Sequence, residues 1–128
     1  MKTWESGRES HLVDDIIAGR KTIEGRLDRS KFSQYELGDR VWLRRDHRDE
    51  AGKLQEGEPR QVLVEVKAIR RYDSFADMTR SENYKNILPG TTSAEEAAAL
   101  YDVYYSAQDQ LKYGVLAIEI AVLSGAQK

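Results

Sequence analysis

The chain contains no cysteine, only two histidines and no long apolar run. Without cysteine it has no thiol nucleophile, disulfide or thiolate metal site. His11 and His47 lie far apart in the sequence and belong to no metal-ligand motif, so we expect neither a metal site nor a cofactor. No apolar run approaches the roughly 18 residues that a membrane span requires, and the start of the chain lacks the apolar core of a signal peptide. These absences predict a soluble, cytoplasmic protein with no membrane partner.

The chain also lacks a strong excess of either charge. Lysine and arginine number 20 against 22 aspartates and glutamates, which gives a net charge of −2. A strongly basic nucleic-acid binder would differ, although an acidic total allows a local basic cleft. With 40% hydrophobic residues in 128, the chain has enough apolar material for one compact core. We expect a single domain over residues 1–128, in which residues 124–128 form a flexible tail.

Capping signals and hydrophobic spacing define the expected elements. A Ser-x-x-Glu capping box at residues 6–9 precedes apolar residues at helical spacing, which predicts a helix over residues 7–18. A second capping box at residues 93–96 and a short cap at Ser74 predict two further helices. Alternating apolar residues predict strands, one of which is interrupted at Ala68 by a bulge or bend. These expected strands are residues 21–27, 40–45, 60–72 and 114–123, with a polar loop or hairpin tip at 46–59.

Residues 21–27 concentrate most of the chemistry of the chain. In an extended segment Glu24 and Arg26 share a face, and Gly25 between them leaves room for another group to approach. Arg26 has a planar fork that suits a phosphate or carboxylate. Glu24 can accept from a nucleobase amino group or act as an acid or base, and Lys21 suits a base because burial lowers the pKa of a lysine. The plainer alternative is an exposed strand with ordinary surface ion pairs.

The motif Gly19-x-Lys21-x-x-Glu24-x-Arg26 resembles the signature of the ASCH domain, the activating-signal-cointegrator homology domain of the PUA-like superfamily. Further blocks that resemble this family follow in the same order and cover nearly the whole chain: Gly38-Asp39, Val66-Lys67-Ala68-Ile69, Tyr72-x-Ser74-Phe75, Leu88-Pro89-Gly90, Tyr101-x-x-Tyr104-Tyr105 and Lys112-Tyr113-Gly114-Val115. The resemblance implies an α+β fold, a small PUA-like mixed β-barrel of about five or six strands with two or three flanking helices.

The resemblance also implies a cleft lined by the signature residues and a role with RNA or nucleotide-like ligands. Some ASCH proteins are described as ribonucleases, and small bacterial members are amidohydrolases that use a Lys, a Thr and a Glu on N4-acetylcytidine. Lys21 matches that Lys, and Glu82, in the Glu82-Asn83 dipeptide, matches that Glu. Glu24 occupies the position of the Thr nucleophile, and Thr22 lies two residues away. This departure favours a binding module over a deacylase.

Aromatic and basic residues extend the candidate site. Tyr101 and Tyr105 share one face of a predicted helix, and Trp42 alternates with the apolar residues of its strand. Each ring either stacks on a base or packs against the core. Two basic groups either flank a phosphate backbone or form a solvated face with their acidic neighbours. These groups are Arg40, Arg44, Arg45 and Arg48, and Lys67, Arg70 and Arg71.

The sequence therefore predicts a module that binds RNA or a modified nucleoside. The expected ligand-binding residues are Lys21, Thr22, Glu24, Arg26, Trp42, Tyr101 and Tyr105. A first alternative is a small hydrolase, of the ribonuclease or N4-acetylcytidine amidohydrolase type, in which Lys21, Glu24 and Glu82 are catalytic. A second alternative is a protein-interaction module that holds a peptide carboxylate at Arg26.

Overall fold

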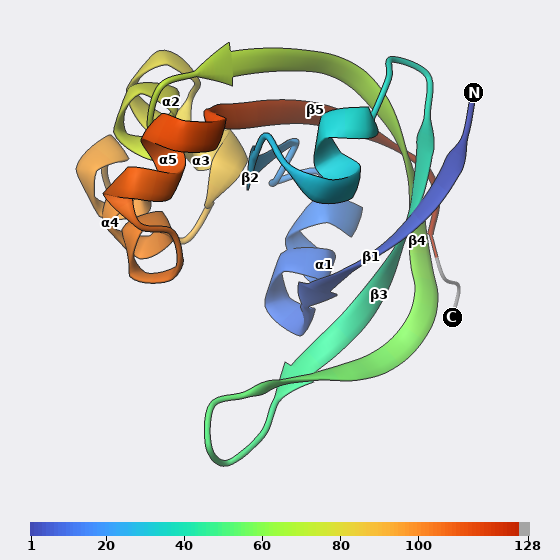
Figure 1. The fold of residues 1–128 in the computed structure, drawn as a ribbon. Helices are drawn as coiled ribbons and strands as arrows, with labels where there is room; N and C mark the ends of the chain where they lie inside the picture. The colour runs from blue at the N-terminus through green and yellow to red at the C-terminus, as the bar shows by residue number, and fades with distance from the viewer. Residues whose placement is uncertain (126–128) are drawn as a thin grey trace.

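A five-stranded mixed sheet forms the frame of the protein (Figure 1), seen in a computed structural model that describes residues 1–125. The strands are β1 (Thr3–Glu9), β2 (Ile23–Leu27), β3 (Arg40–Arg48), β4 (Leu54–Tyr72) and β5 (Val115–Gly125). Their order in the sheet is β1-β3-β4-β5-β2, with β1 parallel to β3 and every other pair antiparallel. The sheet curves strongly without closing, so β1 and β2 are its two edges. This confirms the expected α+β, barrel-like fold.

Short helices fill the curve of the sheet and cover one end of it. The helix α1 (Ser10–Ile17) lies within the curve, whereas α2 (Phe75–Ser81), α3 (Tyr84–Ile87), α4 (Ala94–Tyr104) and α5 (Ala107–Tyr113) gather at one end (Figure 1). A 3-10 helix, η1 (Ser30–Gln34), links β2 to β3. Five α-helices in residues 1–125 exceed the two or three expected. The reason is that serine caps divide residues 74–113 into several short helices: Ser74, Ser93 and Ser106 each accept a backbone N–H three residues ahead.

Two apolar clusters form the core, and β5 contributes to both. Leu116, Ile118 and Ile120 face the cluster between the sheet and α1, whereas Val115 and Ala117 face the cluster beneath the helices. Because successive side chains of a strand point to opposite faces, both faces of β5 are buried. The predicted strand at residues 114–123 is thus confirmed as a central strand.

The N-terminal segment differs from the prediction. Residues 3–9 form β1, and the helix begins only at Ser10, with no side-chain cap at Glu9. The Ser-x-x-Glu pattern of residues 6–9 is therefore not a capping box. Instead these residues pair with Leu43–Asp46 of β3, and Ser6 and Arg8 point into the protein. The parallel backbone ladder, together with these two buried polar side chains, outweighs the local helix signal.

The central hairpin is longer than expected. β3 and β4 run through most of the predicted polar loop at residues 46–59 and leave only residues 49–53 as a turn. The predicted bulge near Ala68 is confirmed by a register shift between Val66 and Ala68 against β5. The expected tail is partly wrong, because β5 extends to Gly125; residues 126–128 lie outside the described residues. Within residues 1–125 no helix is long and apolar enough to cross a membrane.

Candidate functional site

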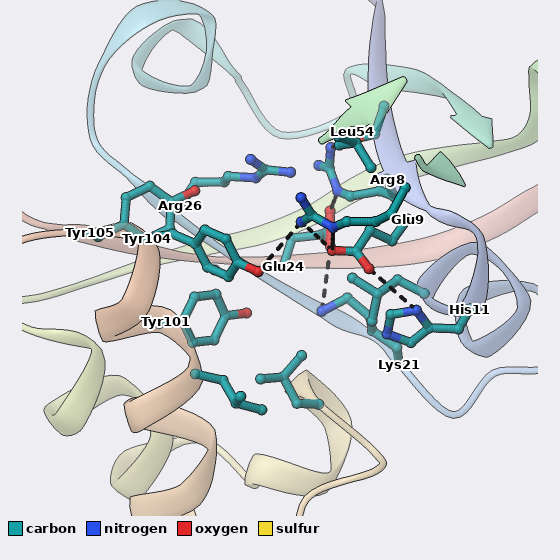
Figure 2. A pocket seen from close by; sticks show the side chains of 16 residues that line it. Arg8, Glu9, His11, Lys21, Glu24, Arg26, Leu54, Tyr101, Tyr104 and Tyr105 are labelled. Atoms are coloured by element: carbon teal, nitrogen blue, oxygen red, sulfur yellow. Dashed lines mark hydrogen bonds and ion pairs between the residues drawn. The ribbon is translucent and has the colours of Figure 1, made fainter. Parts of the chain in front are cut away.

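A pocket of about 470 Å³ lies beside the gap between the two sheet edges, and we call it the seam pocket. Its lining comes from the end of β1, the start of α1, β2, the β3–β4 hairpin and α4 (Figure 2). The residues that line it are Gly7, Arg8, Glu9, His11, Leu12, Lys21, Glu24, Gly25, Arg26, Arg48, Leu54, Leu88, Leu100, Tyr101, Tyr104 and Tyr105. Its volume falls in the range of about 300–1,000 Å³ that is typical of small-molecule sites.

A buried ion cluster forms the floor of the seam pocket. Glu24 of β2 accepts a hydrogen bond from Arg8 Nε of β1, and its other carboxylate oxygen lies 3.4 Å from Lys21 Nζ. All three residues are at most 5% exposed. Lys21 Nζ also donates to the carbonyls of Ile23 at 2.8 Å and Ile87 at 2.5 Å. The Arg8–Glu24 pair thus joins the two edge strands where the sheet has no backbone ladder between them.

The charges of this cluster fix the protonation of Glu24. Burial alone raises the pKa of Glu24, but the cations of Arg8, Lys21 and Arg26 outweigh it and lower that pKa to about 2. Burial lowers the pKa of Lys21, against the opposing effect of Glu24. At neutral pH the floor therefore holds a permanent carboxylate between cations.

Arg26 leaves positive charge unneutralised at the pocket. Within residues 1–125 no carboxylate lies within ion-pairing distance of its guanidinium, which sits 4.8 Å from the centre of the Phe32 ring. Figure 2 shows the guanidinium groups of Arg26 and Arg8 pointing toward one another beside Glu24, with Lys21 on the other side. Four cationic and two acidic side chains line the pocket, so its charge is +2 with His11 neutral. The whole chain, in contrast, carries −2.

Tyr101 and Tyr104 of α4, together with Tyr105 directly after it, form one wall of the seam pocket, and two of these rings pack against the core. Tyr101 stacks on Phe75 at 4.3 Å between ring centres, and Tyr105 stacks on the same ring at 5.1 Å. Burial, followed by the charge of Glu24, raises the pKa of Tyr101. Both predicted residues therefore line the pocket while packing against the core. Tyr104 is 65% exposed and presents its ring at the mouth.

Gly25 allows this wall to approach the floor. A Cβ atom at Gly25 would lie 2.9 Å from Met78 Cε and 2.9 Å from both Cζ and Oη of Tyr101. This confirms the expectation that the missing side chain leaves room for another group, and the group is the Tyr101 ring.

Two residues of the β3–β4 hairpin, Arg48 and Leu54, belong to the pocket lining. Arg48 donates two hydrogen bonds to Glu9 Oε1, at 2.6 and 3.1 Å, and lies 5.6 Å from the centre of the Tyr104 ring. The sequence indicated Arg48 only as one member of a group of basic residues and did not predict that it lines the pocket.

Three predicted site residues lie away from the seam pocket. Thr22 makes backbone hydrogen bonds to Asn86 and Ile120 and does not line the pocket. Trp42 packs on the outer face of β3 near Arg60. Glu82 accepts from Arg70 at 2.6 and 2.9 Å and from the Tyr72 hydroxyl at 2.5 Å. Three of its acceptor positions are used there, and Glu82 does not line the pocket that Lys21 lines.

The two basic groups are largely neutralised by ion pairs. Arg44, Arg45 and Arg48 pair with Asp46, Asp14 and Glu9, and Arg70 and Arg71 pair with Glu82 and Asp28. They therefore form a mixed-charge face. In the part of the chain that the structure describes, no group of three or more His, Asp or Glu residues is arranged to hold a metal ion.

Arg8 is a buried residue of the pocket floor that the sequence analysis did not identify. Arg8 lies in a segment that we expected to be helical, and this segment contains none of the signature residues. The available signal was the two-residue alternation of Trp4, Ser6 and Arg8, which all point inward from β1. Serine and arginine are seldom buried, so hydrophobic periodicity does not detect such a strand.

Comparison with known proteins agrees with this architecture. The sequence profile of the ASCH domain matches residues 10–124. The crystal structure of hypothetical protein PH0355 has a TM-score of 0.78 and 39% identity, over 96% of this chain and 100% of that chain. The solution NMR structure of protein PF0455 from Pyrococcus furiosus has a TM-score of 0.72 and 38% identity, over 94% and 97%. No curated protein matches the chain significantly.

A more distant likeness extends to structures that bear the domain's name. The ASCH domain from Lactobacillus crispatus JV V101 has a TM-score of 0.61 at 12% identity, over 94% of this chain and 79% of that chain. At this identity the likeness concerns the fold alone.

Proposed function

The chain belongs to the ASCH-domain family, and on that premise we propose that it binds single-stranded RNA or a modified nucleoside in the seam pocket. ASCH domains are generally associated with RNA. The observation that carries the proposal is the charge of +2 on the pocket of a chain whose total charge is −2. Such a local excess attracts an anionic ligand although the protein as a whole is acidic.

Arg26 supports contact with a phosphate. Its guanidinium has no carboxylate partner within residues 1–125, and its planar donors match the oxygens of a phosphate. The exposed ring of Tyr104 supports stacking of a base, an interaction worth about 1–3 kcal/mol. A phosphate donor and a stacking surface on one pocket are what a nucleotide requires.

The contacts of Lys21 favour binding over hydrolysis. A lysine ammonium has three N–H donors, and Lys21 directs them to two carbonyls and Glu24. A lysine that is held in this way carries structural charge and has no free position from which to activate a nucleophile. The amidohydrolase Thr position is occupied by Glu24, whose pKa of about 2 keeps it from taking up a proton near neutral pH.

Binding of a short single-stranded RNA, followed by fluorescence anisotropy at several salt concentrations, tests the proposal. We expect Arg26→Ala to weaken binding roughly tenfold or more and to reduce the salt slope by about 0.7. Arg40→Ala is the matched control, because it removes the same charge at the far end of β3, outside the pocket.

Two results would count against RNA binding here. Equal effects of Arg26→Ala and Arg40→Ala would mean that the seam pocket does not hold the phosphate. Binding of a peptide carboxylate that depends on Arg26 and ignores Tyr104→Ala would favour the protein-interaction alternative.

A further inference from the structure

The carboxylate of Glu24 keeps acceptor capacity toward the seam pocket. An ionised carboxylate has about four acceptor positions. Arg8 Nε uses one position on Oε2, and Lys21 Nζ faces Oε1. Within residues 1–125 no other side chain donates to Glu24. Each oxygen therefore retains one position, and the residue lines the pocket.

Hydrogen-bond donors lie directly beside these acceptors. Arg8 donates through Nε and Nη1, while its Nη2 makes no hydrogen bond within the described part of the chain. The guanidinium of Arg26 points to the same place (Figure 2). The floor thus presents two adjacent anionic acceptors and, next to them, guanidinium donors.

Among the RNA bases this pattern matches guanine. The Watson–Crick edge of guanine carries two adjacent donors, N1–H and the N2 amino group, followed by the O6 acceptor. Adenine and cytosine each place one amino donor beside a ring-nitrogen acceptor, and uracil places one N–H between two carbonyls. An acceptor directed at a carboxylate is repelled, so these three bases lose part of the contact.

We propose that the seam pocket selects guanine, with N1–H and the N2 amino group donating to Glu24 and with O6 accepting from Arg8 or Arg26. This inference rests on the proposed binding of RNA and names the base that the floor of the pocket recognises. Protein side chains read unpaired RNA bases through this edge. Glu24 is thereby the residue that determines specificity. Arg26 donates either to O6 of the base or to the phosphate.

Short oligouridylates that carry one central G, A or C test the selectivity with the unmodified protein. We expect the RNA with guanosine to bind roughly five- to a hundredfold more tightly than the other two. Inosine at the same position lacks the N2 amino group and should weaken binding about tenfold. 7-Deazaguanosine keeps the whole Watson–Crick edge and should bind like guanosine, which makes it the matched ligand control.

A protein variant adds a second readout. Glu24→Gln replaces one carboxylate oxygen by a donor, so we expect the preference for G over A to fall to about one; the ratio of the two affinities is the readout, because the lost negative charge acts on both RNAs. A thermal melt shows whether this variant folds; if it does not, the inosine series decides alone. Equal binding of G, A and C, or of guanosine and inosine, would overturn the selectivity but leave RNA binding intact. Absence of binding to every RNA would overturn the selectivity together with the proposed binding of RNA.

Discussion

Replacing Glu24 by leucine removes the anion that lies between the two buried cations Arg8 and Lys21. Arg8 and Lys21 would then keep their charges in a site that is at most 5% exposed. Breaking a buried ion pair by deleting one partner typically costs about 3–5 kcal/mol, because the remaining charge has no compensation. We therefore expect Glu24→Leu to be strongly destabilising.

The lowered pKa of Glu24 gives a similar value for the loss of stability. Each tenfold change in an ionisation constant is worth about 1.4 kcal/mol. Lowering the pKa of Glu24 from 4.5 to about 2 therefore corresponds to about 3 kcal/mol of stability at neutral pH. A loss of about 3–5 kcal/mol should lower Tm by roughly 10–25 °C in a domain of this size.

Urea unfolding of two further variants separates the charge effect from a packing effect. Glu119→Leu is the matched control on the neighbouring strand, because its pair with Arg70 is 44% exposed at the carboxylate and should contribute at most about 1 kcal/mol. The triple variant Arg8→Met, Lys21→Met, Glu24→Leu removes all three charges and should recover most of the stability.

The reasoning about buried charge would be refuted in either of two ways. One is a cost for Glu24→Leu no larger than that for Glu119→Leu. The other is a triple variant that is as unstable as the single one, since the loss would then come from packing or from the carbonyls of Ile23 and Ile87 that Lys21 satisfies, and not from unpaired charge.

Three further predictions concern the same pocket. Gly25→Ala should cost about 1–3 kcal/mol in urea unfolding and weaken RNA binding, because its methyl group would overlap Tyr101; an unchanged midpoint would contradict the close approach. The folded pKa of Glu24 lies below its unfolded value, so its contribution to stability should be complete above about pH 5 and disappear as the pH falls toward 2, measured as unfolding midpoints across that range; a flat profile would show that the carboxylate is not held by cations. Tyr104→Ala should weaken RNA binding by about 1–3 kcal/mol with Tm unchanged, whereas Val103→Ala, at a comparably exposed position of the same helix, should affect neither; equal losses would exclude stacking at Tyr104.

Much of the fold could be predicted because its signals are local. Apolar alternation identified the central strands, since Val62, Val64 and Val66 do point into one cluster. The caps at Ser74 and Ser93 identified two helix starts, because a serine side chain that accepts the third N–H is a short-range interaction. The signature segment was correctly expected to be extended.

The remainder depended on contacts between distant segments. β1 carries little apolar periodicity, and its strand conformation comes from pairing with β3, about 37 residues later in the chain. Glu82 does not reach the seam pocket because its carboxylate is hydrogen-bonded to Arg70 and Tyr72 of β4. Neither pairing leaves a hydrophobic pattern in the sequence, so both the missed Arg8 and the misplaced Glu82 follow from the same cause.

The link between the two edge strands and the candidate site depend on one contact. A closed barrel joins its edge strands through backbone hydrogen bonds, whereas here Arg8 of β1 and Glu24 of β2 join them through a buried ion pair. Apolar side chains of similar volume would often stabilise such a position equally well or better. Stability alone therefore does not account for three charged residues at this place. A ligand that needs a fixed carboxylate beside guanidinium donors would account for them, and the triple variant, which we expect to be stable but unable to bind RNA, separates the two roles.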